Sequence, residues 1–257
     1  MRFASLGSGS QGNALVVEAG ATRVLLDCGF AVKEAVARLA RVGFAVEDLA
    51  GIIVTHEHGD HADGVFPLAR RFGIPVWLTH GTLAALREME TGSDADCRVN
   101  FLRSGEDCAI GDVLVQPYTV PHDAREPVQY VLTDGARRLG VLTDAGCSTA
   151  HIETSLSGCD ALVLECNHDL DMLMNGEYPS SLKARVAGRL GHLDNRTSAT
   201  LLAALDRSRL KHVIAAHLSQ KNNTPDLARG ALAAALDCAQ EWVAVATQDE
   251  GFGWREL

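Results

Sequence analysis

The segment from Gly51 to Gly64 reads GIIVTHEHGDHADG. Its first residues, Gly51–Val54, are apolar and predict a short buried strand. The ten residues after them include three histidines and two aspartates, placed at the carboxyl end of that strand, where α/β proteins commonly bind ligands. Imidazole nitrogens and carboxylate oxygens together suit zinc, manganese or iron, so the segment predicts a metal site.

Four side chains of this segment, His56, His58, Asp60 and His61, are potential metal donors. So close in sequence, they cannot easily all reach one tetrahedral ion and still leave a coordination position open. They fit two adjacent ions better, with His56 and His58 on one ion and Asp60 and His61 on the other. A solvated polar turn is the ordinary alternative, but the pattern HxHxDH after a buried strand favours the metal site.

The composition is typical of a soluble globular protein, with 47% apolar and 22% charged residues in 257. No apolar run approaches the roughly 20 residues that a membrane span needs, and we expect no membrane partner. The seven cysteines include no CxxC pair, so neither a disulfide framework nor a zinc ribbon is indicated. A reducing cytoplasm is the simplest location.

The net charge of −10 argues against indiscriminate coating of nucleic acid, which needs a basic face. A negative net charge is nevertheless compatible with a local basic groove on the surface. Three pairs or groups of cations are candidates for such a groove, or for an ordinary solvated surface: Arg70 with Arg71, Arg137 with Arg138, and Lys183 with Arg185 and Arg189.

The chain shows no repeat, low-complexity tract or linker, so we expect one domain over residues 1–257. Strands are expected at residues 2–6, 14–18, 23–27, 51–54, 76–79, 113–118, 128–133, 139–143, 161–165, 212–216 and 243–247. Helices are expected at residues 32–42, 66–72, 83–89, 182–190, 198–205 and 226–239. Twice along the chain, a strand-rich stretch is followed by a stretch in which strands and helices alternate. This order suggests two sheets flanked by helices, an αββα sandwich; an ordinary α/β sheet is also compatible with the periodicity.

Further donors follow other expected strands. His122 comes just after one strand, His217 ends the apolar run Val213–Ala216, and Asp144 follows Gly140–Thr143. Asp27 follows Val24–Leu26 and is placed to orient a ligand histidine, although a turn-forming aspartate is the alternative.

These residues, in this order, resemble the metallo-β-lactamase superfamily. Proteins of that superfamily have an α+β fold, the αββα sandwich. The resemblance implies two divalent metal ions (zinc, manganese or iron). It implies that His56, His58 and His122 bind one ion, that Asp60, His61 and His217 bind the second, and that Asp144 bridges them. All seven ligands are present.

A narrower resemblance is to the YycJ/WalJ group of that superfamily. It is carried by SLGSGSQGNA (5–14), LLDCGF (25–30), LTDAG (142–146), ECNHD (165–169), GEYPSSLKARVAGRLGHLDN (176–195) and AHLSQKNN (216–223). It implies a 5′→3′ exonuclease on double-stranded DNA with a 5′-phosphate, in some bacteria linked to DNA mismatch repair. Two positions depart from the group's usual pattern: Asp194, where serine is usual, and Gln220, where an acidic residue is common.

The same segments suggest substrate contacts. Lys183 and Arg185, on an expected basic helix, and the uncharged donors Ser219, Asn222 and Asn223, after His217, could hold phosphate oxygens. In a two-metal mechanism a hydroxide that bridges the ions attacks phosphorus in line, with Asp60 and Asp144 holding the geometry. His192 or His168 is expected to protonate the leaving 3′ oxygen; for His168, packing against its neighbours is an equal alternative.

Three rival interpretations remain. One is another hydrolase on the same fold, an RNA-processing phosphodiesterase or a hydrolase of small esters, lactams or thioesters, because fold does not fix chemistry. The extended segment at 176–195 favours a polymeric phosphodiester. The second is an iron-dependent oxidoreductase, which makes less use of Asp60, His61 and His217 when it binds a single iron. The third is a DNA-binding module without activity, which the complete ligand set and the negative charge disfavour.

Overall fold

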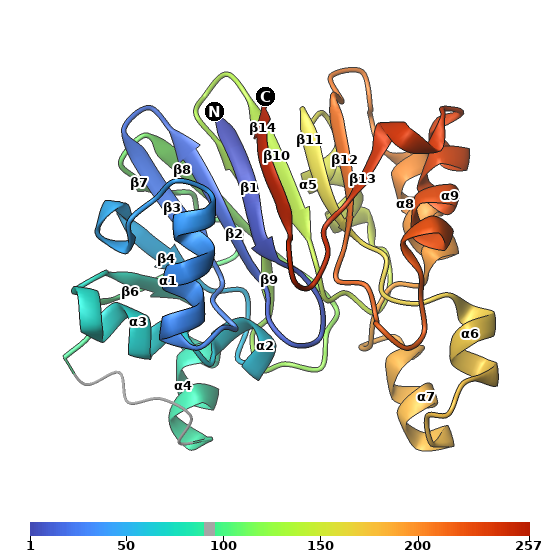
Figure 1. Cartoon of the computed structure of the whole chain (residues 1–257), viewed down its shortest axis with the longest axis horizontal. Coiled ribbons are helices and arrows are strands. Elements are labelled where there is room, and N and C mark those ends of the chain that lie inside the picture. Colours follow the sequence, from blue (N-terminus) through green and yellow to red (C-terminus); the bar gives the residue numbers. More distant parts are fainter. Residues whose placement is uncertain (90–95) are drawn as a thin grey trace.

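Within residues 1–89 and 96–257, which the computed structural model describes, the chain forms two seven-stranded sheets that face each other, with helices on the outer sides (Figure 1). The first sheet has the order β14-β1-β2-β3-β4-β5-β6, with β1 (Arg2–Gly7), β2 (Ala14–Ala19), β3 (Thr22–Leu26), β4 (Gly51–Ile53), β5 (Val76–Leu78), β6 (Val99–Phe101) and β14 (Phe252–Glu256). The second has the order β13-β12-β11-β10-β9-β8-β7, with β7 (Cys108–Ile110), β8 (Val113–Thr119), β9 (Val128–Thr133), β10 (Arg138–Leu142), β11 (Ala161–Glu165), β12 (His212–Ala216) and β13 (Val243–Val245).

Each sheet is antiparallel on one side and parallel on the other. In the first sheet, β14, β1, β2 and β3 pair antiparallel and β3 to β6 pair parallel. In the second, β7 to β10 pair antiparallel and β10 to β13 pair parallel. β11 and β12 are apolar on both faces because helices cover one face and the other sheet covers the second.

The helices are α1 (Val32–Arg41), α2 (Gly59–Ala62), α3 (Val65–Phe72), α4 (His80–Glu88), α5 (Ala150–Leu156), α6 (Leu170–Asn175), α7 (Ser180–Val186), α8 (Asn195–Ala204) and α9 (Pro225–Leu236), with 3₁₀ turns at Val46–Asp48 and Gln240–Trp242. Hydrophobic side chains fill the spaces between the layers. One cluster joins α1, α3 and α4 to the first sheet, one lies between the sheets, and one joins α5, α8 and α9 to the second sheet. This confirms the expected αββα sandwich. The pairing of β14 with β1 brings residues 2–5 and 252–256 side by side in the first sheet, and the single domain over residues 1–257 stays a prediction.

The two sheets are joined by hydrogen bonds directly beneath the histidine-rich segment. The Tyr130 hydroxyl on β9 donates to the Val54 carbonyl at 2.6 Å, and the Val128 N–H donates to the Thr55 carbonyl at 3.1 Å. Tyr130 is fully buried between the sheets. These contacts fix the distance between the sheets at the point where the expected metal ligands begin.

The expected elements differ from the structure in their ends and in several omissions. The expected helix at 182–190 is wrong in its extent, because α7 ends at Val186. The chain turns back there: the His192 N–H donates to the Val186 carbonyl, and a Cβ on Gly191 would lie 2.2 Å from that oxygen. The sequence analysis did not predict β6, β7, β14, α2, α5 or α6. In the described part of the chain, no helix has the length and apolar character to cross a membrane.

We expect Asp160 to stabilise the fold at the strand ends remote from the predicted metal donors. Its side chain is 1% exposed and accepts hydrogen bonds from the Arg138 N–H, Arg137 and Arg209. Burial raises the pKa of this carboxyl, but these donors lower the pKa more, so the net shift is downward. Asp160→Asn should therefore lower the free energy of unfolding at pH 7 by about 1–3 kcal/mol.

The sign of this pH dependence follows from the lowered pKa. The stabilisation by Asp160 is complete above the pKa of an aspartate in the unfolded chain, about 3.9. It is lost as the pH falls through the lower pKa of Asp160 in the folded protein. The difference between wild type and Asp160→Asn in urea unfolding should shrink from pH 7 to pH 3.5. The exposed Asp226→Asn is the control. An equal difference at both pH values would contradict this assignment.

Candidate metal centre

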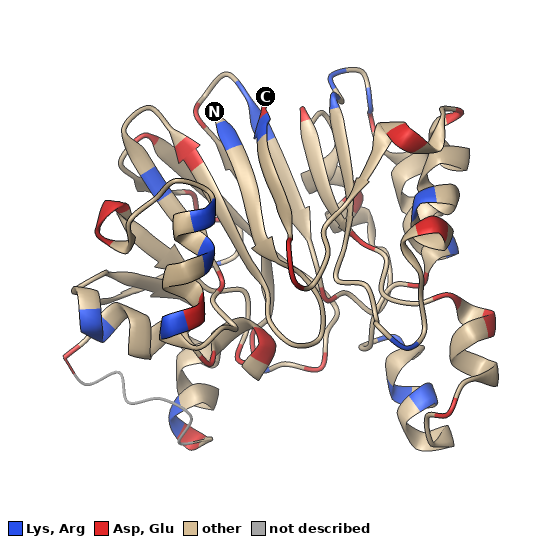
Figure 2. Cartoon of the chain, viewed as in Figure 1, with Lys and Arg blue, Asp and Glu red and all other residues tan. Residues whose placement is uncertain are grey.

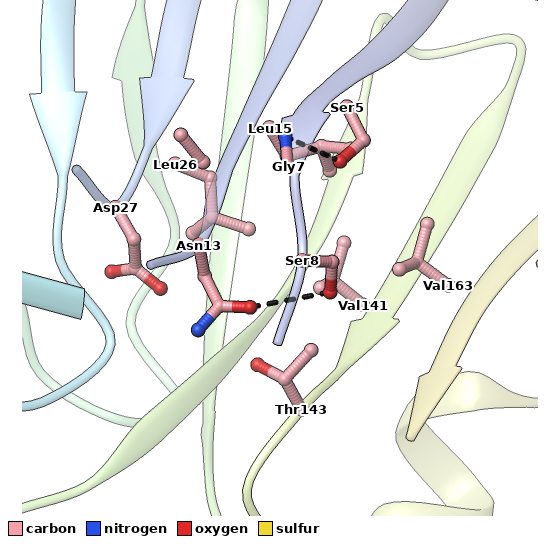
Figure 3. A pocket seen from close by; sticks show the side chains of 11 residues that line it. Ser5, Gly7, Ser8, Asn13, Leu15, Leu26, Asp27, Val141, Thr143 and Val163 are labelled. Atoms are coloured by element: carbon pink, nitrogen blue, oxygen red, sulfur yellow. Dashed lines mark hydrogen bonds between the residues drawn. The ribbon is translucent and has the colours of Figure 1, made fainter. Parts of the chain in front are cut away.

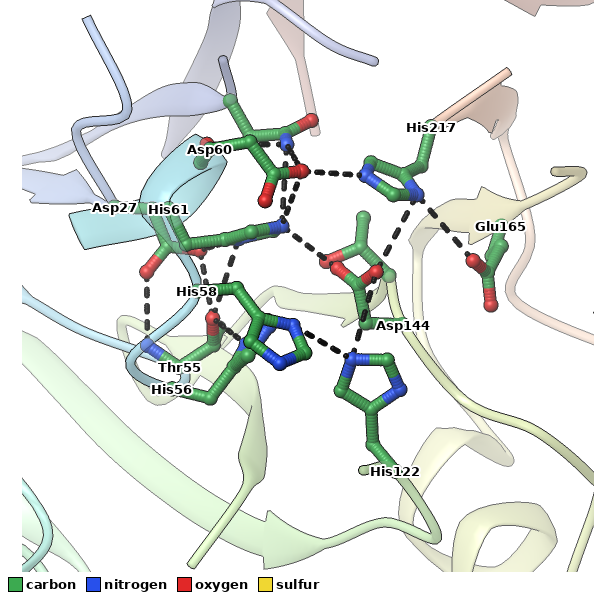
Figure 4. A network of polar contacts seen from close by, with 12 residues as sticks. Asp27, Thr55, His56, His58, Asp60, His61, His122, Asp144, Glu165 and His217 are labelled. Carbon is green, nitrogen blue, oxygen red and sulfur yellow. Dashed lines mark hydrogen bonds and ion pairs between the residues drawn. The ribbon is translucent and has the colours of Figure 1, made fainter. Parts of the chain in front are cut away.

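The predicted donors lie together because the strands that carry them end at one edge of the sandwich. β3 and β4 are parallel in the first sheet, and β8, β10, β11 and β12 run in one direction in the second. The side chains at or just beyond these ends are Asp27 (β3), His56, His58, Asp60 and His61 (β4), His122 (β8), Asp144 (β10), Glu165 (β11) and His217 (β12). The polar network that they form is drawn in Figure 4.

Three of these residues have left-handed backbone conformations. The φ angles are 58° at Asp27, 59° at Asp144 and 55° at His217. Residues with a Cβ rarely adopt this region, and such positions persist only where the surroundings impose them. The surroundings here include the Ile53 carbonyl, which accepts from the Asp27 N–H, and the Ser8 hydroxyl, which accepts from the His217 N–H. Local strain therefore accompanies the turn of three side chains into the site.

The backbone of Asp60 and His61 is held on two sides. The Asn13 N–H donates to the Asp60 carbonyl at 2.7 Å, and the Cys28 N–H donates to the His61 carbonyl at 2.8 Å. Gly29 is required at this contact, because a Cβ there would lie 2.0 Å from the Asp60 carbonyl oxygen. The segment at 25–30 is thus the support on which the HxHxDH segment rests.

The first group of donors is His56, His58 and His122, whose ligand atoms all lie within 4.8 Å of one another. Nδ1 of His58 is 3.2 Å from Nε2 of His122, and Nδ1 of His122 contacts the Gly191 carbonyl at 3.0 Å. Nε2 of His56 is buried and makes no hydrogen bond to the described residues. Burial and the neighbouring histidines hold the pKa of His56 well below its ordinary value, so its ring is neutral, as a metal ligand must be.

The second group is Asp60, His61 and His217, again within 4.8 Å. Nδ1 of His61 contacts Asp27 at 2.8 Å, which leaves Nε2 for a ligand. Nε2 of His217 is 3.2 Å from Asp60 Oδ2. The structure thus places Asp27 where it orients a donor histidine.

Asp144 lies between the two groups. Its carboxylate is buried, with Oδ2 2.7 Å from His61 Nε2 and Oδ1 3.9 Å from His122 Nε2. Together with His56 and His61 it forms a third set of donors within 4.8 Å. An anion buried among histidines needs positive charge nearby. These donor sets fit divalent metal ions, which the family resemblance implies.

His192 joins the site through a residue that sequence analysis did not single out. Nδ1 of His192 is 2.8 Å from Glu165 Oε1 and 3.2 Å from Asp144 Oδ1. Glu165 is fully buried, and its other oxygen accepts from the Ala145 N–H at 2.9 Å. Burial raises the pKa of Glu165, but His192 outweighs it and brings the pKa to about 2, so the carboxylate is charged. Its position as the last residue of an apolar strand was the available signal.

Asn13 is a second residue that sequence analysis missed. Its amide nitrogen lies 3.3 Å from Asp60 Oδ2 and 3.1 Å from His61 Nε2, and its oxygen accepts from the Gly9 N–H. A small cavity of about 30 Å³ lies beside Asn13 and Asp27, between the sheets (Figure 3). This volume is enough for a buried water. The GSGSQGN turn therefore contributes a group that contacts two donors.

Several residues with a predicted catalytic or substrate-binding role have other partners in the structure. His168 is 1% exposed, its Nδ1 contacts Asn167, and it is not among the described residues that line the pocket over the donors. Asn223 is buried and bonded to Asn195 and to the Cys166 carbonyl, and Asn222 is buried beside Ser219. These amides satisfy buried polar groups of the loop after His217. They hold the loop, and because Ser219 and Asn223 also line a second pocket of about 270 Å³, their contact with a substrate stays a prediction.

The pocket over the donors has a volume of about 310 Å³. Arg185 and His192 line it, together with Ser10, His58, Gly59, Asp60, Asp123, Asp144, Leu182, Val186, Gly191 and His217. Lys183 lies on the same helix as Arg185, but its Nζ donates to the Met174 carbonyl and it does not line the pocket. Asp194 caps α8 by accepting from the Arg196 and Thr197 N–H groups, a role that serine also fills.

We expect Asn13→Ala to weaken metal binding at the Asp60, His61 and His217 group by about 10-fold or more, the scale on which partners of ligands act. The measurement is metal titration against a competing chelator. Gln11→Ala is the matched control, because this amide of the same turn bonds to exposed Gln220 and touches no donor. Equal affinity in both variants would contradict the assigned contact.

We also expect metal binding to release protons. Although burial lowers the pKa of His217, Asp144 and Asp60 outweigh this effect and raise the pKa to about 9, so the metal-free protein holds this proton at pH 7.5. A metal must displace it, and affinity should fall as the pH is lowered. Titration calorimetry in two buffers of different ionisation enthalpy should give at least one proton released per protein. Heats independent of the buffer would contradict the charge state.

Residues 22–217 match the family described as "Beta-lactamase superfamily domain". The exodeoxyribonuclease YycJ of Bacillus anthracis is 35% identical over 92% of this chain and 89% of its own length. The exodeoxyribonuclease WalJ of Streptococcus pneumoniae is 31% identical over 88% and 85%. The crystal structure of the metallo-β-lactamase fold protein YhfI from Bacillus subtilis superposes with a TM-score of 0.74 over 99% of both chains at 16% identity, which shows the shared fold. The chain therefore belongs to the β-lactamase superfamily, as a metal-dependent hydrolase of the metallo-β-lactamase fold related to the YycJ and WalJ exodeoxyribonucleases.

Proposed function

We propose that the protein is a two-metal phosphodiesterase that acts on nucleic acid, as a 5′→3′ exonuclease on double-stranded DNA. The observation that carries the proposal is the arrangement of two donor groups around the shared carboxylate of Asp144, with His192 in the same pocket. The names of the two exodeoxyribonuclease relatives support DNA as the substrate. The 5′ polarity and the duplex preference rest on the resemblance to their group.

Besides binding metal, the chain's own residues position the donor groups and hold the substrate. When bound, two divalent ions lower the pKa of water and neutralise charge that develops on phosphoryl oxygens. Asp144 lies close to His61 of one donor group and to His122 of the other, and Asp60 contacts His217 within its own group. Arg185, at the pocket mouth, is placed to hold a phosphate outside them.

His192 is the proposed proton donor to the leaving 3′ oxygen. Because Nδ1 is engaged by Glu165 and Asp144, Nε2 is the ring nitrogen left for the pocket. Burial lowers the pKa of His192, but Glu165 and Asp144 outweigh this effect. In the metal-free protein the pKa of the His192 imidazole therefore lies well above its ordinary value. A protonated imidazole held in this orientation is a general acid.

We expect His192→Gln to lower kcat by about 10²–10⁴-fold, the usual contribution of a positioned general acid. The bound metal, measured by mass spectrometry, should stay at the wild-type level, because the His56, His58 and His122 group and the Asp60, His61 and His217 group are complete without His192. The result that would sink the role is a kcat within threefold of wild type, or a loss of metal that accounts for the lost activity.

The substrate is tested with a duplex DNA labelled at one 5′ end and carrying a 5′-phosphate, incubated with manganese or with zinc. We expect stepwise release of mononucleotides from that end, and no release by Asp60→Ala protein. RNA duplexes and small esters or thioesters are assayed in parallel. Turnover of one of these by metal-loaded protein that leaves DNA intact would keep the metal centre and refute the exonuclease.

A further inference from the structure

One ion pair crosses the mouth of the pocket above the donors. Nε of Arg185 on α7 donates to Oδ2 of Asp123 at 2.6 Å, and both side chains line the pocket. Asp123 follows the donor His122, so the pair joins the edge of the metal centre to the helix at 180–186. A bond this short between charged groups is among the stronger kinds of hydrogen bond.

Asp123 is itself held in place. Its N–H donates to the Leu190 carbonyl at 3.0 Å, and Oδ1 lies 3.6 Å from Nε2 of His122. The carboxylate therefore stands between the guanidinium and the first donor group. Any group that Arg185 binds is placed directly beside the metal centre.

Arg185 keeps most of its hydrogen-bonding capacity free. The pair uses Nε, and in the described residues Nη1 and Nη2 make no hydrogen bond. The side chain is 62% exposed. A guanidinium carries five N–H donors in a planar fork that matches phosphate oxygens, so four remain for a ligand.

The surrounding charge makes Arg185 distinctive. Among the described residues that line the pocket, it is the one arginine or lysine, beside three aspartates, Asp60, Asp123 and Asp144, and three histidines, His58, His192 and His217. The basic residues of α7 are visible beside this edge of the sandwich (Figure 2). No residue of α7 is buried, so packing alone fixes this helix weakly and the pair with Asp123 anchors it.

We propose that Arg185 binds the 5′-terminal phosphate of the DNA strand, next to the phosphate that lies at the metals, and that Asp123 is the positioning residue that holds the guanidinium ready. This proposal rests on the proposed exonuclease function and names the residues that recognise the end of the strand. Asp123 restricts the flexible arginine before substrate arrives, so less freedom is lost on binding. Lysine cannot replace arginine here, because one ammonium cannot present the same planar fork to both partners.

The test compares binding and turnover of duplexes that differ only in a 5′-phosphate or a 5′-hydroxyl. Dissociation constants are measured by fluorescence anisotropy with EDTA-treated protein, which cannot cleave, and kcat and KM with metal-loaded protein. Wild type should bind the phosphorylated end about 10-fold more tightly, the effect of one good arginine–phosphate contact. In Arg185→Ala and Arg185→Lys, the ratio of the dissociation constant of the 5′-hydroxyl duplex to that of the 5′-phosphate duplex should fall toward one. KM for the 5′-phosphate duplex should rise, and kcat should stay within threefold of wild type.

Asp123→Ala should lower the same ratio by a smaller factor, and Asp123→Asn, which keeps an oxygen acceptor for Nε, should retain most of it. Lys183→Ala is the matched control, because it removes one positive charge from the same helix at a side chain that bonds to the Met174 carbonyl. It should leave the ratio unchanged. Thermal unfolding and metal content are measured for every variant, so that misfolding is recognised.

The outcomes separate the two proposals. Wild-type cleavage of DNA with an unchanged phosphate-to-hydroxyl ratio in Arg185→Ala would overturn the role of Arg185 and leave the exonuclease intact. Uniformly weaker binding of both duplexes by Arg185→Ala would also overturn it, because the contact would then be to the general backbone. Failure of wild type to bind or cleave DNA would overturn both.

Discussion

The buried carboxylate of Asp144 is the group on which the site depends. Asp144 follows β10 of the second sheet, and it lies 2.7 Å from Nε2 of His61, which lies on α2 after β4 of the first sheet. It also lies 3.2 Å from His192 and 3.4 Å from His217, so four segments of the chain meet at one side chain. A buried anion is costly unless cations surround it, and this arrangement is therefore stable only with protons or metal ions among the histidines. Asp144 thus links the packing of the two sheets to the chemistry at their edge.

The distance between the two halves of the site is set by the sandwich and not by the loops. The cluster between the sheets, which includes Phe3, Ile53 and Val141, fixes how closely the strand ends approach. The Tyr130 hydroxyl bonds across the gap to Val54, one residue before the histidine-rich segment starts. Loops then supply side chains, and left-handed backbone at Asp27, Asp144 and His217 accompanies their turn into the site. A rigid scaffold with strained strand ends is a common way to preorganise a reactive centre.

Sequence alone predicted the sandwich and most of the donors because their signals are local. HxHxDH after a buried strand, and His122, Asp144 and His217 after further apolar runs, each combine a strand with a polar terminus. Glu165 and Asn13 were missed because their roles come from tertiary contacts: one ends a buried strand beside His192, and the other reaches Asp60 from a glycine-rich turn 47 residues away. The helix at 182–190 was overextended because its composition favours helix, whereas close backbone contacts at Gly191 end it at Val186. Asn222 and Asn223 were expected to contact substrate, and His168 to donate a proton, from their neighbours in sequence, and the structure shows each of them buried with structural partners.

The central claim is that this strand edge holds two metal ions that share Asp144. Anomalous diffraction at the metal absorption edge, from crystals of the wild-type protein loaded with manganese or zinc, tests it most directly. The account predicts two peaks roughly 3.5–4 Å apart, the usual spacing of two-metal sites, one among His56, His58 and His122 and the other among Asp60, His61 and His217. A single peak at full loading, or a second peak bound away from Asp144, would contradict it.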